Sequence, residues 1–334
     1  MDPVKFSVVV PVYRNEGSIP DLVAALQRMS EVLEGRMEAV LVVDGSPDRS
    51  HERLRALLPA SGLDAQLLLL SRNFGSFPAI RAGLGAARGE HYAVMAADLQ
   101  EPESLILEFF RTLDAGTADV VLGVRTGRVD PLGSRLASGL FWGLYRALVQ
   151  PDVPPGGVDV FGCNRAFRNH LLALDEAHSS LVGQVIWLGF RRAQIAYERL
   201  PRRHGRSAWT LGRKLRYFSD RLFSFSDLPI RALTWAGALG LALSLVLGSV
   251  VLAARLTGHI EIPGYAATVL SILFFASLNS FGLGIIGGYA WRAYDNVKGR
   301  PLAIVMTAQR FGPAASSHAG SLGASRATPG VAPP

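Results

Sequence analysis

The chain has 334 residues, of which 49% are hydrophobic and only 18% are charged, whereas a typical soluble domain carries roughly 25% charged residues. The shortage is local, because residues 232–254 and 262–291 contain no charged side chain. Each run exceeds the roughly 20 apolar residues that cross a bilayer core. The composition therefore excludes a fully soluble protein and predicts two transmembrane helices, 232–254 and 262–291.

The net charge of +7 is also local. Between residues 199 and 221 the chain carries eight Lys or Arg side chains against one acid, Asp220, so the rest of the chain is neutral. A basic segment just before a membrane span favours anionic lipid headgroups or a phosphate ligand as its partner. No nucleic-acid-binding module accompanies the segment, so nucleic acid is not an expected partner. The single cysteine, Cys163, excludes a disulfide framework.

The first 125 residues alternate between short apolar runs and segments of helical length. We expect strands at 6–13, 39–44, 65–70, 92–98 and 118–125, and helices at about 18–34, 48–59, 76–88 and 102–115. Near-continuous apolar runs are typical of strands buried on both faces of a parallel sheet. The alternation predicts a doubly wound, mostly parallel α/β domain, whose ligands bind beyond the carboxyl ends of the strands.

The rest of the chain predicts a membrane-associated architecture. Residues 126–208 are less regular and are expected to complete a domain that spans 1–208. In the region 209–231, apolar residues recur at alternating spacings of four and three, which predicts an amphipathic helix on the membrane surface: Leu211, Leu215, Phe218, Leu222 and Phe225. The alternative is a helix packed on its own domain. The tail, residues 312–334, is rich in Ala, Ser, Gly and Pro and is expected to be disordered.

Basic residues set the expected orientation in the membrane. One basic residue, Arg255, lies in the loop that connects the two spans. Five flank the spans on their outer sides: Arg221, Arg231, Arg292, Lys298 and Arg300. Lys and Arg accumulate on the cytoplasmic side of membrane spans. We therefore expect an integral membrane protein with both termini, and the domain 1–208, in the cytoplasm.

Two acidic residues follow expected strands at equivalent places. Asp44 ends the second strand and Asp98 ends the fourth. Asp is common at turns, so either residue alone is weak evidence. Together, at the carboxyl edge of one sheet, they suit a divalent cation that bridges to a diphosphate. The first strand lacks a G-x-G-x-x-G sequence after it, and no Walker, G-x-S-x-G or H-E-x-x-H motif occurs, which argues against the corresponding nucleotide-binding and hydrolytic classes.

Five segments then occur in the order typical of glycosyltransferase family 2: VVVPVYRNEGSI, VVDGSPDRS, SRNFGSFPAIRAGL, AADLQEPE and RRHGRSAW. The chain resembles the polyprenyl-phosphate glycosyltransferases of that family over residues 5 to about 300. The resemblance implies a GT-A-type fold and an inverting transfer from a UDP- or GDP-linked sugar to an undecaprenyl- or dolichyl-type phosphate, in synthesis of a cell envelope glycan. It implies Mg²⁺ or Mn²⁺ as cofactor, and it leaves a homo-oligomer open.

The resemblance also implies roles for residues that would hold the nucleotide sugar. Pro11 and Tyr13 match positions that flank the base and ribose. Asp44 matches the second Asp of the family's D-D-G-S and would contact the nucleoside, with Ser46 beside it. Glu16 takes the acidic role of P-x-Y-N-E one place late in the sequence. Arg72 begins the R-N-F-G segment and would meet the donor.

A second group of residues would hold the metal and the phosphates. Asp98 and Gln100 match the catalytic, metal-binding end of D-x-D-L-Q, and Arg202 and Ser207 match an R-x-x-G-x-S loop near the phosphates. Arg125 ends the fifth expected strand, where a guanidinium suits two-point binding of the acceptor phosphate.

The carboxylate set departs from the family pattern at two positions. Val43 stands where D-D-G-S has its first Asp, and Ala96 stands where D-x-D has its first Asp. Fewer carboxylates put metal affinity in question, although Mg²⁺ keeps several waters and can rely on one carboxylate beside a substrate diphosphate. Because of Val43 and Ala96, a catalytically impaired scaffold that binds nucleotide sugar stays open as an alternative. A glycosyltransferase that acts on another lipid or on a polysaccharide is a separate alternative.

Overall fold

The computed structural model describes residues 4–125, 158–176, 179–201 and 264–312, together with separate positions between 230 and 257. These residues divide into two compact units. The first unit comprises 1–114, 200–205 and 303–334, and the second comprises 115–199 and 206–302.

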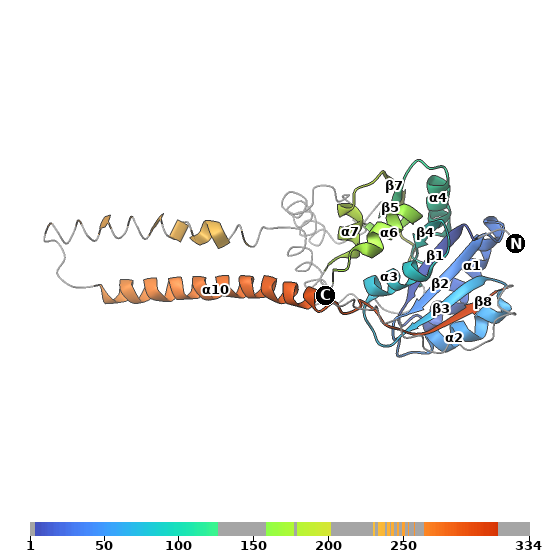
Figure 1. Cartoon of the computed structure of the whole chain (residues 1–334), viewed down its shortest axis with the longest axis horizontal. Helices are drawn as coiled ribbons and strands as arrows, with labels where there is room; N and C mark the ends of the chain where they lie inside the picture. The colour runs from blue at the N-terminus through green and yellow to red at the C-terminus, as the bar shows by residue number, and fades with distance from the viewer. Residues whose placement is uncertain are drawn as a thin grey trace, which may run out of the picture. The chain divides into compact units, whose positions relative to one another are not determined.

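The first unit is built on a mixed sheet with the strand order β4-β1-β2-β3-β8 (Figure 1). Its strands are β1 (Phe6–Val12), β2 (Met37–Val43), β3 (Asp64–Leu70), β4 (His91–Val94) and β8 (Val305–Phe311). Strand β1 pairs in parallel with β2 and β4, and β2 pairs in parallel with β3. The four strands predicted here are thus confirmed, except that β4 ends at Val94, so Asp98 lies in the loop after the strand and not at its predicted end. Strand β8 was not predicted, and it pairs with β3 in the antiparallel direction.

Four helices connect or cover these strands, each close to its predicted range: α1 (Ile19–Val32), α2 (Ser50–Leu57), α3 (Ser76–Ala86) and α4 (Glu103–Asp114). All residues of β2 are buried, as expected for a strand covered on both faces. Helix α3 packs on β1 and β2. Gly83 permits this close approach, because a Cβ atom there would collide with the side chains of Val9 and Val42.

A buried ionic network joins the amino ends of the strands. The Glu38 side chain on β2 is fully buried and accepts hydrogen bonds from Ser7 Oγ (2.7 Å) and Gln66 Nε2 (2.9 Å). The Glu38 oxygen that accepts Gln66, Oε2, also pairs with Arg88 Nε at 2.8 Å. The same guanidinium forms an ion pair with Asp64 at 2.6 Å. Burial alone would raise the pKa of Glu38, but the hydrogen bonds from Arg88, Ser7 and Gln66 outweigh it and lower the pKa.

This lowered pKa predicts how stability depends on pH. A carboxylate whose pKa is lower in the folded chain stabilises it above the unfolded value of about 4.3, and the contribution is lost as pH falls through the folded pKa. We expect Glu38→Gln to lower the free energy of unfolding by about 3 kcal/mol at pH 7, with a smaller deficit at pH 4. Urea unfolding at both values measures this. Glu34→Gln, at an exposed ion pair with Arg36, is the control and should change little.

The second unit contains a smaller group of strands. These are β5 (Val120–Arg125), β6 (Val158–Asn164) and β7 (Arg192–Tyr197), accompanied by α6 (Arg165–Ala173) and α7 (Leu181–Trp187). Strand β5 runs antiparallel to β6 and parallel to β7. The predicted strand 118–125 is thereby confirmed as β5.

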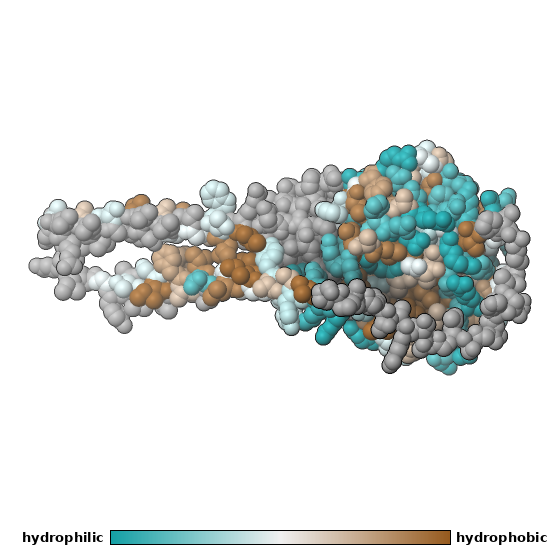
Figure 2. All heavy atoms as spheres, viewed as in Figure 1, coloured by the Kyte–Doolittle hydropathy of each residue, from teal (hydrophilic) through white to brown (hydrophobic). Residues whose placement is uncertain are grey.

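A helix of 33 residues, α10 (Tyr265–Val297), covers most of the second predicted span. Its described side chains are largely apolar and exposed, as the brown residues along α10 show (Figure 2). Gly282 on α10 lies against Leu233, and Phe275 lies against Gly240. Residue numbers rise along α10 as they fall along the segment that holds Leu233 and Gly240. That segment and α10 therefore run antiparallel.

Counting only the residues whose placement is described, we find no helix with the length and apolar character needed to cross a membrane. The two predicted transmembrane helices therefore stay predictions. Apart from Ile230 and Gly312, the region 209–231 with its predicted amphipathic helix and the tail 312–334 lie outside the described residues.

Candidate active site

The carboxyl ends of β1, β2 and β4 bring the predicted residues of the first unit to one edge of its sheet. Val12 is level with Val43, and Val9 is level with Val94. Asp44 therefore leaves β2 beside Tyr13, and the segment after β4 reaches the same edge before Asp98. The register of the parallel strands thus places the starts of these loops at one edge of the sheet, and the roles of their residues stay predictions.

Asp44 clamps the end of β2 to the loop that follows β3. One carboxylate oxygen accepts the amide of Phe74 at 2.7 Å and the other accepts the amide of Gly75 at 2.9 Å. Only 2% of Asp44 is exposed. Burial raises the pKa of Asp44, although these two amides and the guanidinium of Arg72 oppose the shift. The side chain predicted to contact the nucleoside thus fixes the R-N-F-G segment.

Gly45 makes the close approach of the same two loops possible. Its φ of +53° is left-handed. A Cβ atom there would lie 2.5 Å from the backbone nitrogen of Asn73 and 2.7 Å from Cα of Arg72, and closer still to the Arg72 carbonyl carbon. Backbone atoms cannot rotate away as a side chain can, so only glycine fits. Gly45 was not among the predicted site residues.

A second clamp holds the turn after β1 through its backbone amides. Ser46 Oγ accepts the amide of Arg14 at 2.8 Å and donates to Asp48 at 2.6 Å. The other Asp48 oxygen accepts the amide of Glu16 at 3.0 Å. Ser50 Oγ accepts the amide of Asn15 at 3.2 Å and also donates to Asp48, at 2.7 Å. The turn is therefore held by groups that come from the loop after β2.

Asp48 is the centre of this clamp, and sequence reasoning did not assign it. Burial alone would raise the pKa of Asp48, but the hydroxyls of Ser46 and Ser50, together with the amides of Glu16 and Ser50, lower it. The signal was its place in the quoted segment VVDGSPDRS. Ser46, by contrast, was predicted, and the structure places it in the clamp.

Glu16 faces the start of α2. Its carboxylate pairs with Arg49 at 3.3 Å and with Arg53 at 3.1 Å. Arg49 and Arg53 thus pair with the carboxylate to which the resemblance assigned a role in nucleotide binding. The nucleotide contact of Glu16 stays a prediction.

Two exposed arginines flank the clamped loops. Arg14, at a left-handed φ of +54°, lies over the ring of Tyr13 with its guanidinium carbon 5.4 Å from the ring centroid. Arg72 lies 4.0 Å over the ring of Phe74 in the same manner. Among the described residues, neither guanidinium pairs with a carboxylate. The edge thus presents aromatic rings and positive charge, which suit a nucleotide. Pro11, half-buried near the end of β1, completes this group.

The loop after β4 holds Asp98 in a tight turn. The Asp98 carboxylate accepts the amide of Gln100 at 3.3 Å, and Leu99 between them has a left-handed φ of +55°. The buried Glu101 accepts the amide of Ala96 at 3.3 Å. Residues other than glycine rarely adopt the left-handed backbone conformation, and those that do cluster at functional sites.

Asp98 and Gln100 were predicted as metal ligands. Within the described part of the chain, no group of three or more His, Cys, Asp and Glu side chains could hold a metal ion. The two predicted ligands offer hard oxygens, one from a carboxylate and one from an amide, which suit Mg²⁺ or Mn²⁺ only when water and a diphosphate complete the ligand set. This fits a cation that arrives with its substrate.

Three residues were predicted to bind the phosphates. Arg125 ends β5 in the second unit, opposite Tyr197 of β7. Arg202 and Ser207 lie outside the described residues. All three roles stay predictions.

The chain is similar in sequence to a known protein family and to several known glycosyltransferases. A model described as "Glycosyl transferase family 2" matches residues 7–173. The "Uncharacterized glycosyltransferase sll0501" of Synechocystis sp. is 30% identical, covering 90% of this chain and 95% of its own. The "SfII prophage-derived bactoprenol glucosyl transferase" of Shigella flexneri is 29% identical over 93% of this chain and 100% of its own. The structure of mannosyltransferase PcManGT from Pyrobaculum calidifontis has a TM-score of 0.46 at 18% identity, covering 90% of this chain and 89% of that one.

Proposed function

The chain belongs to glycosyltransferase family 2, and we propose that it transfers a sugar from a nucleotide-diphosphate sugar to a polyprenyl phosphate. It is a glycosyltransferase, and its mixed α/β sheet is GT-A-like, as expected. The acceptor is proposed on one observation above all. A relative named bactoprenol glucosyl transferase aligns with 93% of this chain and with its own entire length.

The nucleotide end of the donor is proposed to lie across the clamped loops after β1, β2 and β3. Asp44 and Gly45 fix the R-N-F-G segment, and Asp48 fixes the turn that carries Tyr13 and Arg14. Two loops held rigid before the ligand arrives lose little freedom on binding. The rings of Tyr13 and Phe74 carry the guanidiniums of Arg14 and Arg72. Within the described part of the chain neither guanidinium pairs with a carboxylate, and such groups suit a base and an anionic diphosphate.

Asp98 and Gln100 would hold the divalent cation that the family implies. Bound there, the cation would offset the negative charge that develops on the departing nucleoside diphosphate. Asp98 is kept in place by the amide of Gln100. The chain's own task is therefore to orient the diphosphate at the β4 end, and one carboxylate is its main negative group for that task.

The proposed reaction needs no base from the protein. A phosphate monoester carries about 1.5 to 2 negative charges near neutral pH, so its oxygen is already nucleophilic. That oxygen forms a bond to the anomeric carbon while the bond from this carbon to the donor diphosphate breaks, with inversion. Basic side chains at Arg125, Arg202 and the surrounding segment are proposed to hold the acceptor phosphate and to offset the charge.

A sugar-transfer assay tests the proposal. Membranes containing the chain are incubated with undecaprenyl phosphate and, in turn, with radiolabelled UDP-glucose, UDP-N-acetylglucosamine and GDP-mannose. We expect one donor to label a lipid that mild acid cleaves. Label in an acid-stable lipid or a polysaccharide favours the second candidate, suggested by the shared family. Absence of turnover with every donor favours the nucleotide-sugar scaffold, which Val43 and Ala96 suggest.

We further propose that the chain is an integral protein of the bacterial inner membrane with both termini in the cytoplasm. We expect Gly258→Cys to react with an impermeant maleimide added to intact cells and Ser316→Cys to react only after lysis. The parent chain is a suitable background, because its one cysteine, Cys163, is buried and burial raises its thiol pKa. Labelling of Ser316→Cys in intact cells contradicts the topology.

A further inference from the structure

The turn after β1 donates four consecutive backbone amides to side-chain acceptors. The amide of Tyr13 donates to the side-chain oxygen of Asn15 at 3.1 Å. The amides of residues 14–16 donate to side chains of the loop after β2, namely Ser46, Ser50 and Asp48. Arg14 in this turn is left-handed, and such a conformation persists only where the surroundings enforce it. The shape of the turn therefore depends on these partners.

Glu16 makes the connection in the opposite direction, because its side chain binds the loop after β2. Its Oε2 accepts the backbone amide of Arg49 at 3.3 Å. Arg49 is the N-cap residue of α2, and its own side chain forms no capping hydrogen bond. The first amides of a helix have no partner within it, and that end of a helix favours negative charge. Glu16 therefore caps α2 from a different loop.

The other oxygen of Glu16 is shared by two guanidiniums. Oε1 lies 3.3 Å from Arg49 Nε and 3.1 Å from a guanidinium nitrogen of Arg53. These arginines are four positions apart, a spacing at which like charges on a helix repel one another. Only 25% of the Glu16 side chain is exposed, so solvent screens its charge less than that of a fully exposed acid. The shared carboxylate therefore offsets the repulsion between Arg49 and Arg53.

These contacts use most of the hydrogen-bonding capacity of the Glu16 carboxylate. An ionised carboxylate has about four acceptor sites, and one amide and two guanidiniums already engage this one. A ribose hydroxyl that bound there at two points would have to displace one of them. The geometry thus favours a role for Glu16 within the protein over contact with a nucleotide.

We propose that Glu16 is a positioning residue, whose carboxylate fastens the start of α2 to the turn after β1 and does not contact the nucleotide. The proposal rests on the nucleotide site proposed above, and it replaces the role that the resemblance implied for Glu16. Asp48 holds the turn and Glu16 holds the loop after β2, so each segment fixes the other. Loss of the Glu16 charge should therefore loosen the turn that presents the Tyr13 ring and the Arg14 guanidinium.

Glu16→Gln and Arg53→Gln test the two partners separately. The first removes the negative charge, whereas the second leaves the Glu16 carboxylate intact and able to bind a nucleotide. We expect both to speed deuterium exchange of the amides of residues 14–16 severalfold. Both should weaken UDP and GDP binding about threefold to fivefold, the scale of one partly exposed ion pair. In the transfer assay the change should raise KM for the donor and spare kcat, because the turn binds the nucleotide equally throughout the reaction.

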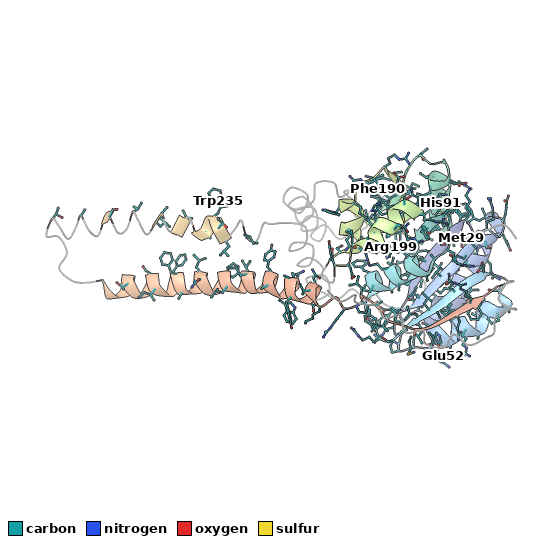
Figure 3. All side chains as sticks on the ribbon, in the orientation of Figure 1. Met29, Glu52, His91, Phe190, Arg199 and Trp235 are labelled. Carbon is teal, nitrogen blue, oxygen red and sulfur yellow. The ribbon has the colours of Figure 1, made fainter. Side chains whose placement is uncertain are left out.

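A double variant measures whether Glu16 acts through Arg53. With both substitutions the same interaction is lost only once, so the double variant should bind UDP and GDP no more weakly than the weaker single variant. Two controls make the same chemical changes at exposed positions of α2: Glu52→Gln, at the residue labelled in Figure 3, and Arg55→Gln. Both controls should match the parent in exchange and in nucleotide binding.

Other results overturn the proposal. Weaker nucleotide binding by Glu16→Gln with parental exchange, beside parental binding by Arg53→Gln, shows that Glu16 contacts the nucleotide directly. Losses that add in the double variant show that the two side chains act independently. Faster exchange with parental nucleotide affinity shows that the turn does not shape the nucleotide site. If the parent chain binds neither UDP nor GDP, the proposed function fails, and the exchange measurements still decide whether Glu16 holds the turn.

Discussion

Gly45→Ala is expected to lower the free energy of unfolding by about 2 to 5 kcal/mol and to abolish nucleotide binding. Two costs add up at this position. A non-glycine residue in the left-handed region costs about 1 to 2 kcal/mol, and forcing an extra carbon into a filled space costs about 1 to 3 kcal/mol. The added carbon would meet backbone atoms of Arg72 and Asn73, so the loops must separate. Their separation would pull Phe74 and Gly75 away from Asp44.

Gly35→Ala provides a matched control. Gly35 has a φ of +72°, and a Cβ atom there meets nothing within 4 Å. It therefore reports the cost of the backbone conformation without any collision, about 1 kcal/mol, and nucleotide binding should survive. Urea unfolding and titration with UDP and GDP measure both variants. If Gly45→Ala loses no more stability than Gly35→Ala, the two loops move apart easily and the clamp does not shape the site.

The parallel part of the sheet was predictable because burial on both faces leaves a strong pattern. The expected strands 6–13, 39–44, 65–70 and 92–98 overlap β1 to β4. The sheet edge that gathers Asp44 and Asp98 then follows from strand direction alone. Here a local signal, an apolar run followed by an acid, coincides with the three-dimensional arrangement.

Strand β8 could not be predicted from a pattern of buried residues. Its side chains are mostly exposed, so burial leaves no apolar run. It becomes a strand by pairing with β3, more than two hundred residues earlier in the chain. The sequence segment after α10 carries no sign of that partner, and an antiparallel edge strand was therefore missed.

The clamps were missed for a related reason. Asp48 and Gly45 stand inside a recognised segment, yet each also meets another loop, since Asp48 accepts the amide of Glu16 and Gly45 lies against Arg72 and Asn73. A motif gives the residue types that a family uses, but it does not say which of them contact a ligand and which hold another loop. Asp44 illustrates this, because its carboxylate oxygens both accept backbone amides.

Asp98→Asn is expected to reduce sugar transfer by about 10² to 10³, the usual loss when one electrostatic contact to developing charge is removed. Asparagine keeps the volume of the side chain and an oxygen that can accept the amide of Gln100, so the turn should persist. Only the negative charge that would hold the cation is deleted. Transfer rates measured against Mg²⁺ and Mn²⁺ concentration test this, with Asp175→Asn, at an exposed position, as the control.

Ala96→Asp supplies the complementary change, because it restores the first Asp of the family's D-x-D. Its amide already donates to the buried Glu101, so the new carboxylate would stand near Glu101 and Asp98 and repel both. A bound cation relieves that repulsion. We therefore expect Ala96→Asp to need less metal for half-maximal transfer and to unfold more readily once metal is removed by EDTA. Full transfer by Asp98→Asn, with no change in metal dependence in Ala96→Asp, contradicts a metal role for this turn and leaves charge neutralisation to the arginines.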